Sequence, residues 1–279
     1  MREALIVSTA RTPIGKAYRG AFNDTQAQEL GGHAIKHAVE RSKVAPDEIE
    51  DVILGAAMQQ GSTFQNIGRQ AAIRAGLPTS VSGMSMDRQC ASGMMAIATA
   101  AKQIITDRMD VVAAGGQESI SLVQTKEMRV MPDPELVNMH GAIYMPMLQT
   151  AETVAQRYGI SREAQDEYAL QSQQRTAAAQ EAGKFDDEIV SVSTTHKVQD
   201  KETGEISDVE ITIDKDEGNR PQTTLEGLNS LKPVMGEGTT ITAGNASQLS
   251  DGSSASVLME AKVAEQKGLE PLGRYVGMA

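Results

Sequence analysis

The residue with the most distinctive chemistry in this sequence is Cys90, the single cysteine among 279 residues. It stands in the stretch DRQCASGMMAIATAA at 87–101, just before small residues and a long apolar run. Most free cysteines are small buried hydrophobes. A cysteine at the start of a helix has a lowered pKa, because the free N–H groups there favour the thiolate, which is the nucleophilic form. Both interpretations stay open on this stretch alone.

The residues that follow Cys90 suit acyl transfer. Ala91, Ser92 and Gly93 are small enough to let a substrate approach the backbone. The N–H of Cys90 could also help to bind an oxyanion. An acyl-carrying cysteine needs a low pKa, a dry surrounding and donors aimed at the carbonyl oxygen. The stretch predicts the first and third of these properties.

Other patterns that could bind a cofactor or metal are weak. His33 and His37 are spaced i, i+4, which suits a metal, but there is no HExxH motif and no evident third ligand. We therefore favour a solvated helix face and predict no metal. Gly115 and Gly116 follow an apolar run, but the GxGxxG pattern of a dinucleotide site is absent.

The first 118 residues alternate between strand-like and helix-like patterns. Strands are predicted at 4–8, 52–55, 82–86 and 110–116, and helices at 26–41, 66–75 and 90–105. This rhythm indicates an α/β sheet with parallel strands. The apolar residues of 94–105 leave that helix without a clear polar face, which predicts burial on all sides. One sheet covers only one side, and the sequence does not obviously supply a second cover.

The pattern changes after residue 118. Residues 119–150 are irregular, 150–182 form a helical pair with Ser161 as an N-cap and Gly183 as the end, and 186–235 are charged and strand-poor. A strand at 251–260 would return to the first sheet, and another begins at 274–279. We predict three parts: an α/β domain at 1–118 and 250–270, an inserted α+β loop domain at 119–249, and the start of a further domain at 271–279.

Composition and charge exclude several classes. Hydrophobic residues make up 40% and charged residues 23%, which is typical of a globular protein. The net charge of −11 argues against a nucleic-acid partner, although an anionic small molecule can bind locally. The apolar stretch at the N-terminus is too short for a signal peptide or a membrane span. We expect a cytoplasmic protein without a membrane partner.

Several motifs, in order along the whole chain, resemble the thiolases, the family of acetyl-CoA acetyltransferases and 3-ketoacyl-CoA thiolases. They are VSTARTPIGKAYRGAF, DRQCASGMMAIATAAKQI, VVAAGGQESIS, YMPMLQTAETVAQRYGISREAQDEYALQSQQRTAAAQ and TITAGNASQLSDGSSASVLM. The resemblance implies a layered α/β fold, of which this chain contains the N-terminal half with its loop domain. Glu118, after the glycine pair, matches a structural position in the family.

The resemblance implies a transferase of fatty acid metabolism with Cys90 as its nucleophile. Cys90 would take an acyl group from acyl-CoA as a thioester, and a second acetyl-CoA would attack that thioester to give a 3-ketoacyl-CoA. The reverse direction is thiolysis. Coenzyme A thioesters are substrates, and no separate cofactor is implied.

The resemblance also implies four residues that bind coenzyme A. Ser247 in TAGNAS matches a contact to pantetheine, with Ala243 beside it. Arg220 in GNRPQTTLEGL matches an arginine near the nucleotide end, and Met147 matches a methionine that lines the pocket. The histidine that usually precedes this methionine is replaced by Pro146.

Two motifs of the family's C-terminal half do not occur here. They are GHP, whose histidine activates the nucleophile, and CxGGG, whose cysteine moves the proton of the attacking methyl group. We therefore expect no turnover from a protein of these 279 residues alone. The alternative is a non-catalytic fragment that binds coenzyme A or serves assembly. Family members are usually homodimers or homotetramers, and an α/β half with exposed edges favours an oligomer.

Overall fold

The computed structural model describes residues 2–128 and 131–279 and divides into two compact units. Unit 1 contains Met1–Met128, Asp187–Glu217 and Leu249–Ala279, and unit 2 contains Arg129–Asp186 and Gly218–Gln248. Cys90 therefore belongs to unit 1, whereas all four residues expected to bind coenzyme A belong to unit 2. The residues 187–217 lie in unit 1, although the sequence groups them with the insertion at 119–249. The predicted domain boundaries stay a prediction.

Unit 1 is built on a seven-stranded sheet with the order β4-β3-β5-β8-β1-β9, in which β2 also pairs with β8. The strands are β1 (Ala4–Arg11), β2 (Gly15–Lys16), β3 (Asp51–Gly55), β4 (Ser82–Met86), β5 (Val111–Ser119), β8 (Ser250–Glu260) and β9 (Gly273–Arg274). β3 pairs parallel with β4 and β5. β8 pairs antiparallel with both β5 and β1, so β1 runs in the same direction as β3, β4 and β5. The prediction of parallel strands in the first 118 residues is therefore confirmed, and β8 is the antiparallel strand between them.

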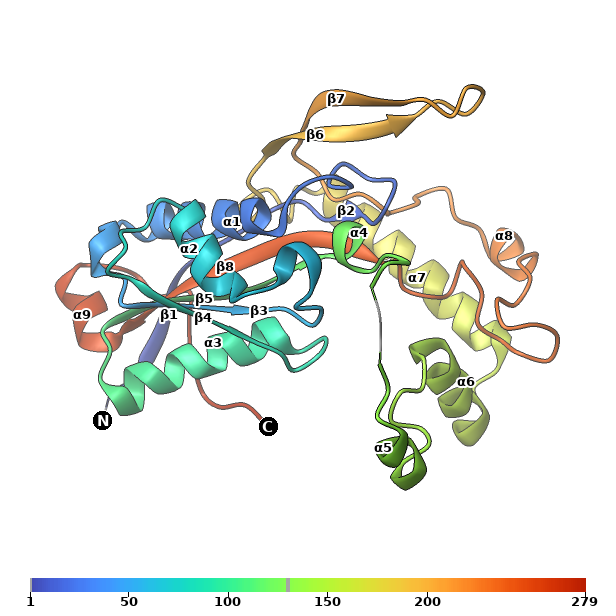
Figure 1. Cartoon of the computed structure of the whole chain (residues 1–279), viewed down its shortest axis with the longest axis horizontal. Helices are drawn as coiled ribbons and strands as arrows, with labels where there is room; N and C mark the ends of the chain where they lie inside the picture. Colours follow the sequence, from blue (N-terminus) through green and yellow to red (C-terminus); the bar gives the residue numbers. More distant parts are fainter. Residues whose placement is uncertain (1, 129–130) are drawn as a thin grey trace. The chain divides into compact units, whose positions relative to one another are not determined.

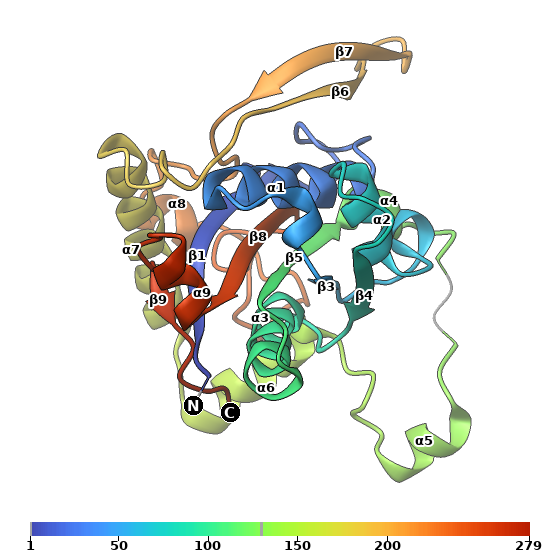
Figure 2. The ribbon, with the colours of Figure 1, turned by 90° about the vertical axis from the view of Figure 1, so that its left-hand side faces the viewer.

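Helices cover both faces of this sheet, as Figures 1 and 2 show. α1 (Ala27–Ser42) and α2 (Ile67–Arg74) lie on one face, and α3 (Ser92–Lys102) lies on the other. The alternation of side chains along β5 serves both layers. Val111 and Ala113 join the core under α1 and α2, whereas Val112 and Ala114 join the core under α3.

α3 is buried on one side only. Ala96, Ala100 and Ala101 are fully buried against the sheet, but Met94 is 63% exposed. The prediction of burial on all sides is thus not met within the described residues. The helix continues into a π-helical turn, η3 (Gln103–Asp107).

The chain between the first strands and β8 contains more regular structure than the sequence predicts. The segment expected to be strand-poor forms a hairpin of β6 (Val192–Gln199) and β7 (Ile206–Ile213), whose base is buried through the pair Val192 and Ile213. The remaining short elements of unit 1 are η1 (Pro46–Glu48), η2 (Gly61–Thr63), α4 (Ile120–Val123) and α9 (Ala261–Gln266).

Unit 2 is mainly helical. Its helices are α5 (Pro134–Met139), α6 (Met147–Tyr158), α7 (Arg162–Glu181) and α8 (Leu225–Asn229). The predicted cap of α7 is confirmed, because the Ser161 side chain accepts a hydrogen bond from the Ala164 N–H. Gly183, with φ +65°, ends the helix as predicted. None of the described helices is both long and apolar enough to cross a membrane.

Candidate functional site

Cys90 lies in the turn that joins β4 to α3, and its side chain is exposed. The helix begins at Ser92 with Ala91 as the N-cap, so the predicted helix start at Cys90 is two residues early. Exposure argues against the interpretation of Cys90 as a small buried hydrophobe. It also means that the described residues around the thiol do not enclose it in the dry surrounding that acyl transfer needs.

Two side chains hold the turn that carries Cys90. The Ser92 hydroxyl donates to the carbonyl oxygen of Gln89 over 2.6 Å and accepts from the N–H of Arg88 over 2.9 Å. Asp87 Oδ1 accepts from the N–H of Gln89 over 2.6 Å. Gln89 has φ +49°, a left-handed conformation that is unfavourable for a residue with a side chain. The hydrogen bonds therefore hold strained backbone directly before the nucleophile.

Hydrogen bonds inside this turn also limit which N–H groups can bind an oxyanion. The N–H of Ala91 donates to the carbonyl of Arg88, and the N–H of Ser92 donates to the carbonyl of Gln89. Neither N–H is left to bind substrate in this conformation. The N–H of Cys90 stays the predicted donor.

Glycines allow the start of α3 to lie directly on two strands of the sheet. A Cβ atom on Gly55, the last residue of β3, would overlap the backbone carbonyl group of Ser92. A Cβ atom on Gly116 of β5 would lie 2.9 Å from Cα of Gly93. Only glycine permits such close approach, so these residues fix the nucleophile turn against the sheet.

Glu118 continues the same face of β5 beyond Gly116. Its carboxylate accepts hydrogen bonds from the N–H groups of Ala57 and Met58, in the turn that follows β3. Burial raises the pKa of Glu118 above its ordinary value, against these two hydrogen bonds, and the charges of Asp87 and Asp251 raise it further. The carboxylate thus ties one loop to the sheet beside the turn of Cys90.

The two histidines of α1 do not lie beside Cys90. His33 and His37 lie on α1, on the opposite face of the sheet from α3 (Figure 2). Their rings are in edge contact with centroids 4.5 Å apart, and His37 pairs with Glu40 over 2.9 Å. Burial lowers the pKa of His33, and the neighbouring His37 lowers it further. The described part of unit 1 therefore places neither imidazole of α1 next to the thiol.

In unit 2, two of the expected coenzyme A residues share one turn. Ala243 and Ser247 are exposed, whereas the neighbouring Thr242 is fully buried. The Thr242 N–H donates to Asn245 Oδ1 over 2.7 Å, and the Ala246 N–H donates to the carbonyl of Thr242 over 3.1 Å. The turn thus anchors itself inside unit 2 and presents Ala243 and Ser247 outward.

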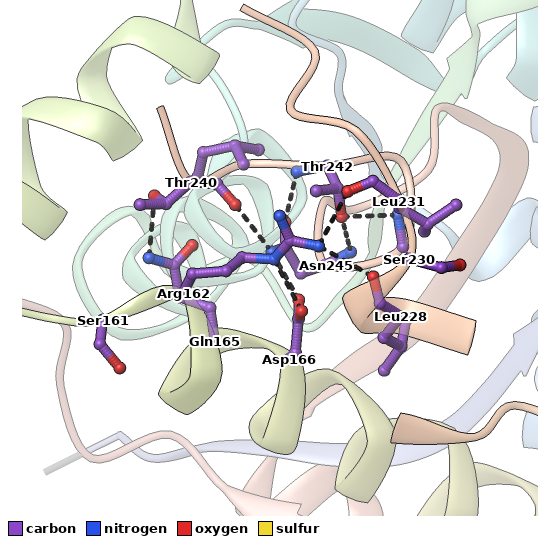
Figure 3. A network of polar contacts seen from close by, with 12 residues as sticks. Ser161, Arg162, Gln165, Asp166, Leu228, Ser230, Leu231, Thr240, Thr242 and Asn245 are labelled. Carbon is purple, nitrogen blue, oxygen red and sulfur yellow. Dashed lines mark hydrogen bonds and ion pairs between the residues drawn. The ribbon is translucent and has the colours of Figure 1, made fainter. Parts of the chain in front are cut away.

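Buried carboxylates fix both ends of this turn, and Figure 3 shows one of them. Asp166 of α7 is fully buried and accepts from Asn245 Nδ2 over 2.9 Å and from Arg162 Nε over 2.6 Å. Glu152 of α6 accepts from the N–H groups of Thr240 and Ile241, each over 2.7 Å. Although burial opposes it, these hydrogen bonds lower the pKa of Glu152.

The other two expected residues lie elsewhere in unit 2. Arg220 is exposed in the segment before α8, and its N–H donates to Gln173 Oε1 over 2.8 Å. Met147 is the first residue of α6 and is 71% exposed. Pro146, which replaces the expected histidine, is the N-cap of this helix.

Sequence reasoning missed the residues that support these sites. Ser92, Glu152, Asp166 and Gln173 carry no motif of their own that points to a role. The available signal is the i, i+4 spacing of Arg162 and Asp166, which predicts a local ion pair on a helix. The contacts of Asp166 with Asn245 cross 79 residues and follow only from the fold.

Comparison with known proteins agrees with this organisation. Residues 4–262 match the family model described as "Thiolase, N-terminal domain". A 3-ketoacyl-CoA thiolase of Bacillus subtilis is 39% identical, with alignment over 100% of this chain and 71% of that protein. An acetyl-CoA acetyltransferase of Cupriavidus necator is 40% identical over 98% of this chain and 70% of that protein.

The fold is also similar to a solved structure. A crystal structure of the Bacillus anthracis acetyl-CoA acetyltransferase superposes with a TM-score of 0.83 and 36% sequence identity. The match covers 99% of this chain and 70% of that chain. Sequence and fold give the same answer: this chain belongs to the thiolase family.

Proposed function

We propose that this chain supplies the nucleophile of an acyl-CoA:acetyl-CoA C-acyltransferase, with Cys90 as the residue that carries the acyl group. The observation that carries the proposal is the exposed thiol of Cys90, held in a strained and hydrogen-bonded turn at the start of α3. A thiolate at that position attacks the carbonyl carbon of an acyl-CoA. The bond from that carbon to the coenzyme A sulfur breaks, and the coenzyme A thiolate leaves and takes up a proton.

The second half of the reaction forms a carbon–carbon bond. The methyl group of acetyl-CoA loses a proton, and the resulting enolate attacks the Cys90 thioester. The Cys90 thiolate leaves, and 3-ketoacyl-CoA is the product. The relatives named 3-ketoacyl-CoA thiolase and acetyl-CoA acetyltransferase support both directions of this chemistry.

Four exposed positions of unit 2 would bind the coenzyme A part. We assign Ser247 and Ala243 to the pantetheine and Met147 to the pocket wall, and we assign Arg220 to the phosphates at the nucleotide end. We further propose a homodimer or homotetramer, since β4 is an edge strand of the sheet. Sedimentation equilibrium checks this assembly, and a monomer at micromolar concentration would refute it.

The second candidate is a protein that binds coenzyme A without turning it over. It is favoured by the position of His33 and His37 on the face of the sheet opposite α3, which leaves neither imidazole of α1 next to the Cys90 thiol. On this basis we expect acylation of Cys90 without release of acetoacetyl-CoA from a protein of these 279 residues.

Intact mass spectrometry before and after incubation with acetyl-CoA tests the proposal. Because Cys90 is the single cysteine of the sequence, a gain of one acetyl group that disappears in Cys90→Ser assigns the nucleophile. A protein that binds coenzyme A in calorimetry but gains no acetyl group would support the non-catalytic candidate. Release of acetoacetyl-CoA by the verified 279-residue protein would overturn the expectation of no turnover.

A further inference from the structure

α7 carries two polar side chains that each hold a different part of the proposed coenzyme A site. Asp166 and Gln173 are seven residues apart, so they lie on one face of the helix, separated by two turns or about 10 Å along its axis. Every residue involved in their contacts belongs to unit 2. The helix therefore joins two segments that are far apart from it in sequence.

Asp166 holds the turn that presents Ala243 and Ser247. Its Oδ1 accepts from Asn245 Nδ2, and the same amide donates to the carbonyl of Thr240 over 3.1 Å (Figure 3). The side-chain oxygen of Asn245, Oδ1, closes the turn by accepting from the Thr242 N–H. Loss of the Asp166 carboxylate would leave the Asn245 amide with only one of its two acceptors, and the turn would lose its link to α7.

Arg162 fixes the carboxylate in turn. Its Nε donates to Asp166 Oδ2 over 2.6 Å, and its Nη2 donates to the carbonyl oxygens of Leu228 and Leu231 over 2.8 and 3.1 Å. Figure 3 shows the guanidinium among these partners. Since Asp166 is fully buried and paired, its position has little freedom.

Gln173 holds the segment that carries Arg220. Its Oε1 accepts from the Arg220 N–H over 2.8 Å and from Asn219 Nδ2 over 3.0 Å. The backbone carbonyl of Gln173 accepts from the same Asn219 amide over 3.0 Å. The backbone at Arg220 is thus tied to α7, while its exposed side chain is left to meet a ligand.

We propose that α7 fixes the distance between the segment that contacts the pantetheine and the segment that contacts the nucleotide end of coenzyme A. Asp166 and Gln173 are its positioning residues: Asp166 acts through the turn of Ala243 and Ser247, and Gln173 acts through Arg220. This inference rests on the proposed function. The proposal implies that the site favours ligands long enough to contact both the turn of Ala243 and Ser247 and the segment of Arg220.

The two contacts can be separated with two acyl donors. Acetyl-CoA has both the pantetheine and the nucleotide end, whereas S-acetylpantetheine lacks the nucleotide. The rate of Cys90 acetylation, followed by mass spectrometry over a range of donor concentrations, gives a half-saturation concentration and a limiting rate for each. For Gln173→Ala we expect the half-saturation concentration to rise about three- to tenfold for acetyl-CoA, as for the loss of one or two hydrogen bonds, and to stay unchanged for S-acetylpantetheine.

Asp166→Asn should affect both donors, because the pantetheine contact is common to them. The new amide cannot accept from both Arg162 and Asn245 without pointing its own N–H groups at one of them. The double variant Asp166→Asn/Asn245→Asp restores a donor and an acceptor across this pair and should recover part of the affinity. In every variant the limiting rate and the rate of Cys90 alkylation by iodoacetamide should stay near the wild-type values, since neither positioning residue touches the nucleophile.

Matched controls come from exposed neighbours on the same helix. Gln174→Ala and Glu167→Gln remove an amide and a charge at exposed positions and should change neither half-saturation concentration. If Asp166→Asn does not fold, Gln173→Ala still tests the proposal, because Gln173 is only half-buried and its truncation should leave the protein folded. The proposal for α7 would be overturned if Gln173→Ala changed the half-saturation concentration equally for both donors, or did not change it for acetyl-CoA. Failure of the wild-type protein to acetylate would instead refute the proposed function.

Discussion

The Ser92 hydroxyl donates to the carbonyl oxygen of Gln89 and thereby closes the turn in which Cys90 lies. Ser92 is 3% exposed, and the same oxygen accepts from the N–H of Arg88. One buried hydroxyl thus satisfies two backbone groups of the residues that precede the nucleophile. Gln89 has a strained, left-handed backbone conformation, and the hydrogen bonds of Ser92 keep the turn from relaxing out of it.

Ser92→Ala should therefore displace Cys90 without unfolding unit 1. Loss of two hydrogen bonds is expected to destabilise the protein by about 1–3 kcal/mol. We expect acetylation by acetyl-CoA to slow by more than the alkylation of Cys90 by iodoacetamide, which needs only exposure. Parallel rate measurements check this. The control is Thr99→Ala, which removes a hydroxyl that bonds to Met95 within α3. Equal slowing in both variants would assign the effect to the helix and not to the turn.

Gly55→Ala tests the close approach of α3 to the sheet. The added Cβ would overlap the backbone of Ser92, which cannot move without shifting the helix start. We expect a loss of about 1–3 kcal/mol in urea denaturation, typical of overpacking, together with slower acetylation of Cys90. Gly277→Ala, where a Cβ meets no atom within 4 Å, should leave both quantities unchanged. Wild-type stability of Gly55→Ala would show that the helix can withdraw freely.

The strands and helices around Cys90 could be predicted because their patterns are local. The strand at 82–86 has the predicted bounds, and the cap at Ser161 follows from its residue type. The direction of β8 could not be predicted, since strand direction depends on the path of the chain through 120–249. The β6–β7 hairpin was not predicted, because β6 is an exposed strand with mostly polar residues and lacks a clear alternation of apolar and polar side chains.

The candidate site shows the same limit. Cys90, Ala243 and Ser247 stand out in the sequence because short motifs surround them. Glu118 and Asp166 gain their roles from partners far along the chain, such as Ala57 and Asn245. Spacing along a chain carries no information about such pairs until the fold is known.

Glu118 gives a pH dependence to unit 1. Its pKa is raised, first by burial, so the folded state favours the protonated carboxyl. The stabilisation is present below the ordinary pKa of a glutamate and is lost as the pH rises through the raised value. Glu118→Gln cannot ionise but keeps an oxygen for the N–H of Ala57. We expect it to be more stable than the wild type at pH 8, with a difference that shrinks towards pH 4.

Thermal melts of both proteins between pH 4 and pH 8 measure this difference. Exposed Glu167→Gln is the control, because it removes one negative charge from the same protein of net charge −11 without changing a buried group. A pH-independent gap between Glu118→Gln and wild type would contradict the assignment.

Glu152 gives unit 2 the opposite dependence. Burial raises its pKa, but the N–H groups of Ile241 and Thr240 lower it by more, so the folded state favours the charged carboxylate. Its stabilisation is present above the ordinary pKa and is lost as the pH falls through the lowered value. In Glu152→Gln the amide oxygen can still accept from the N–H groups of Thr240 and Ile241, and the NH2 group faces the Thr240 hydroxyl, but the negative charge that strengthens these hydrogen bonds is lost. This loss should loosen the segment by about 1–2 kcal/mol at neutral pH. Hydrogen exchange of the peptide 238–248, corrected for intrinsic rates, should therefore be faster in the variant at pH 7, and the difference should narrow in acid.

Glu163→Gln, exposed in the first turn of α7, is the control and should exchange like the wild type. An exchange rate of Glu152→Gln that equals the wild type at pH 7 would mean that the carboxylate does not hold the segment leading into the turn of Ala243 and Ser247.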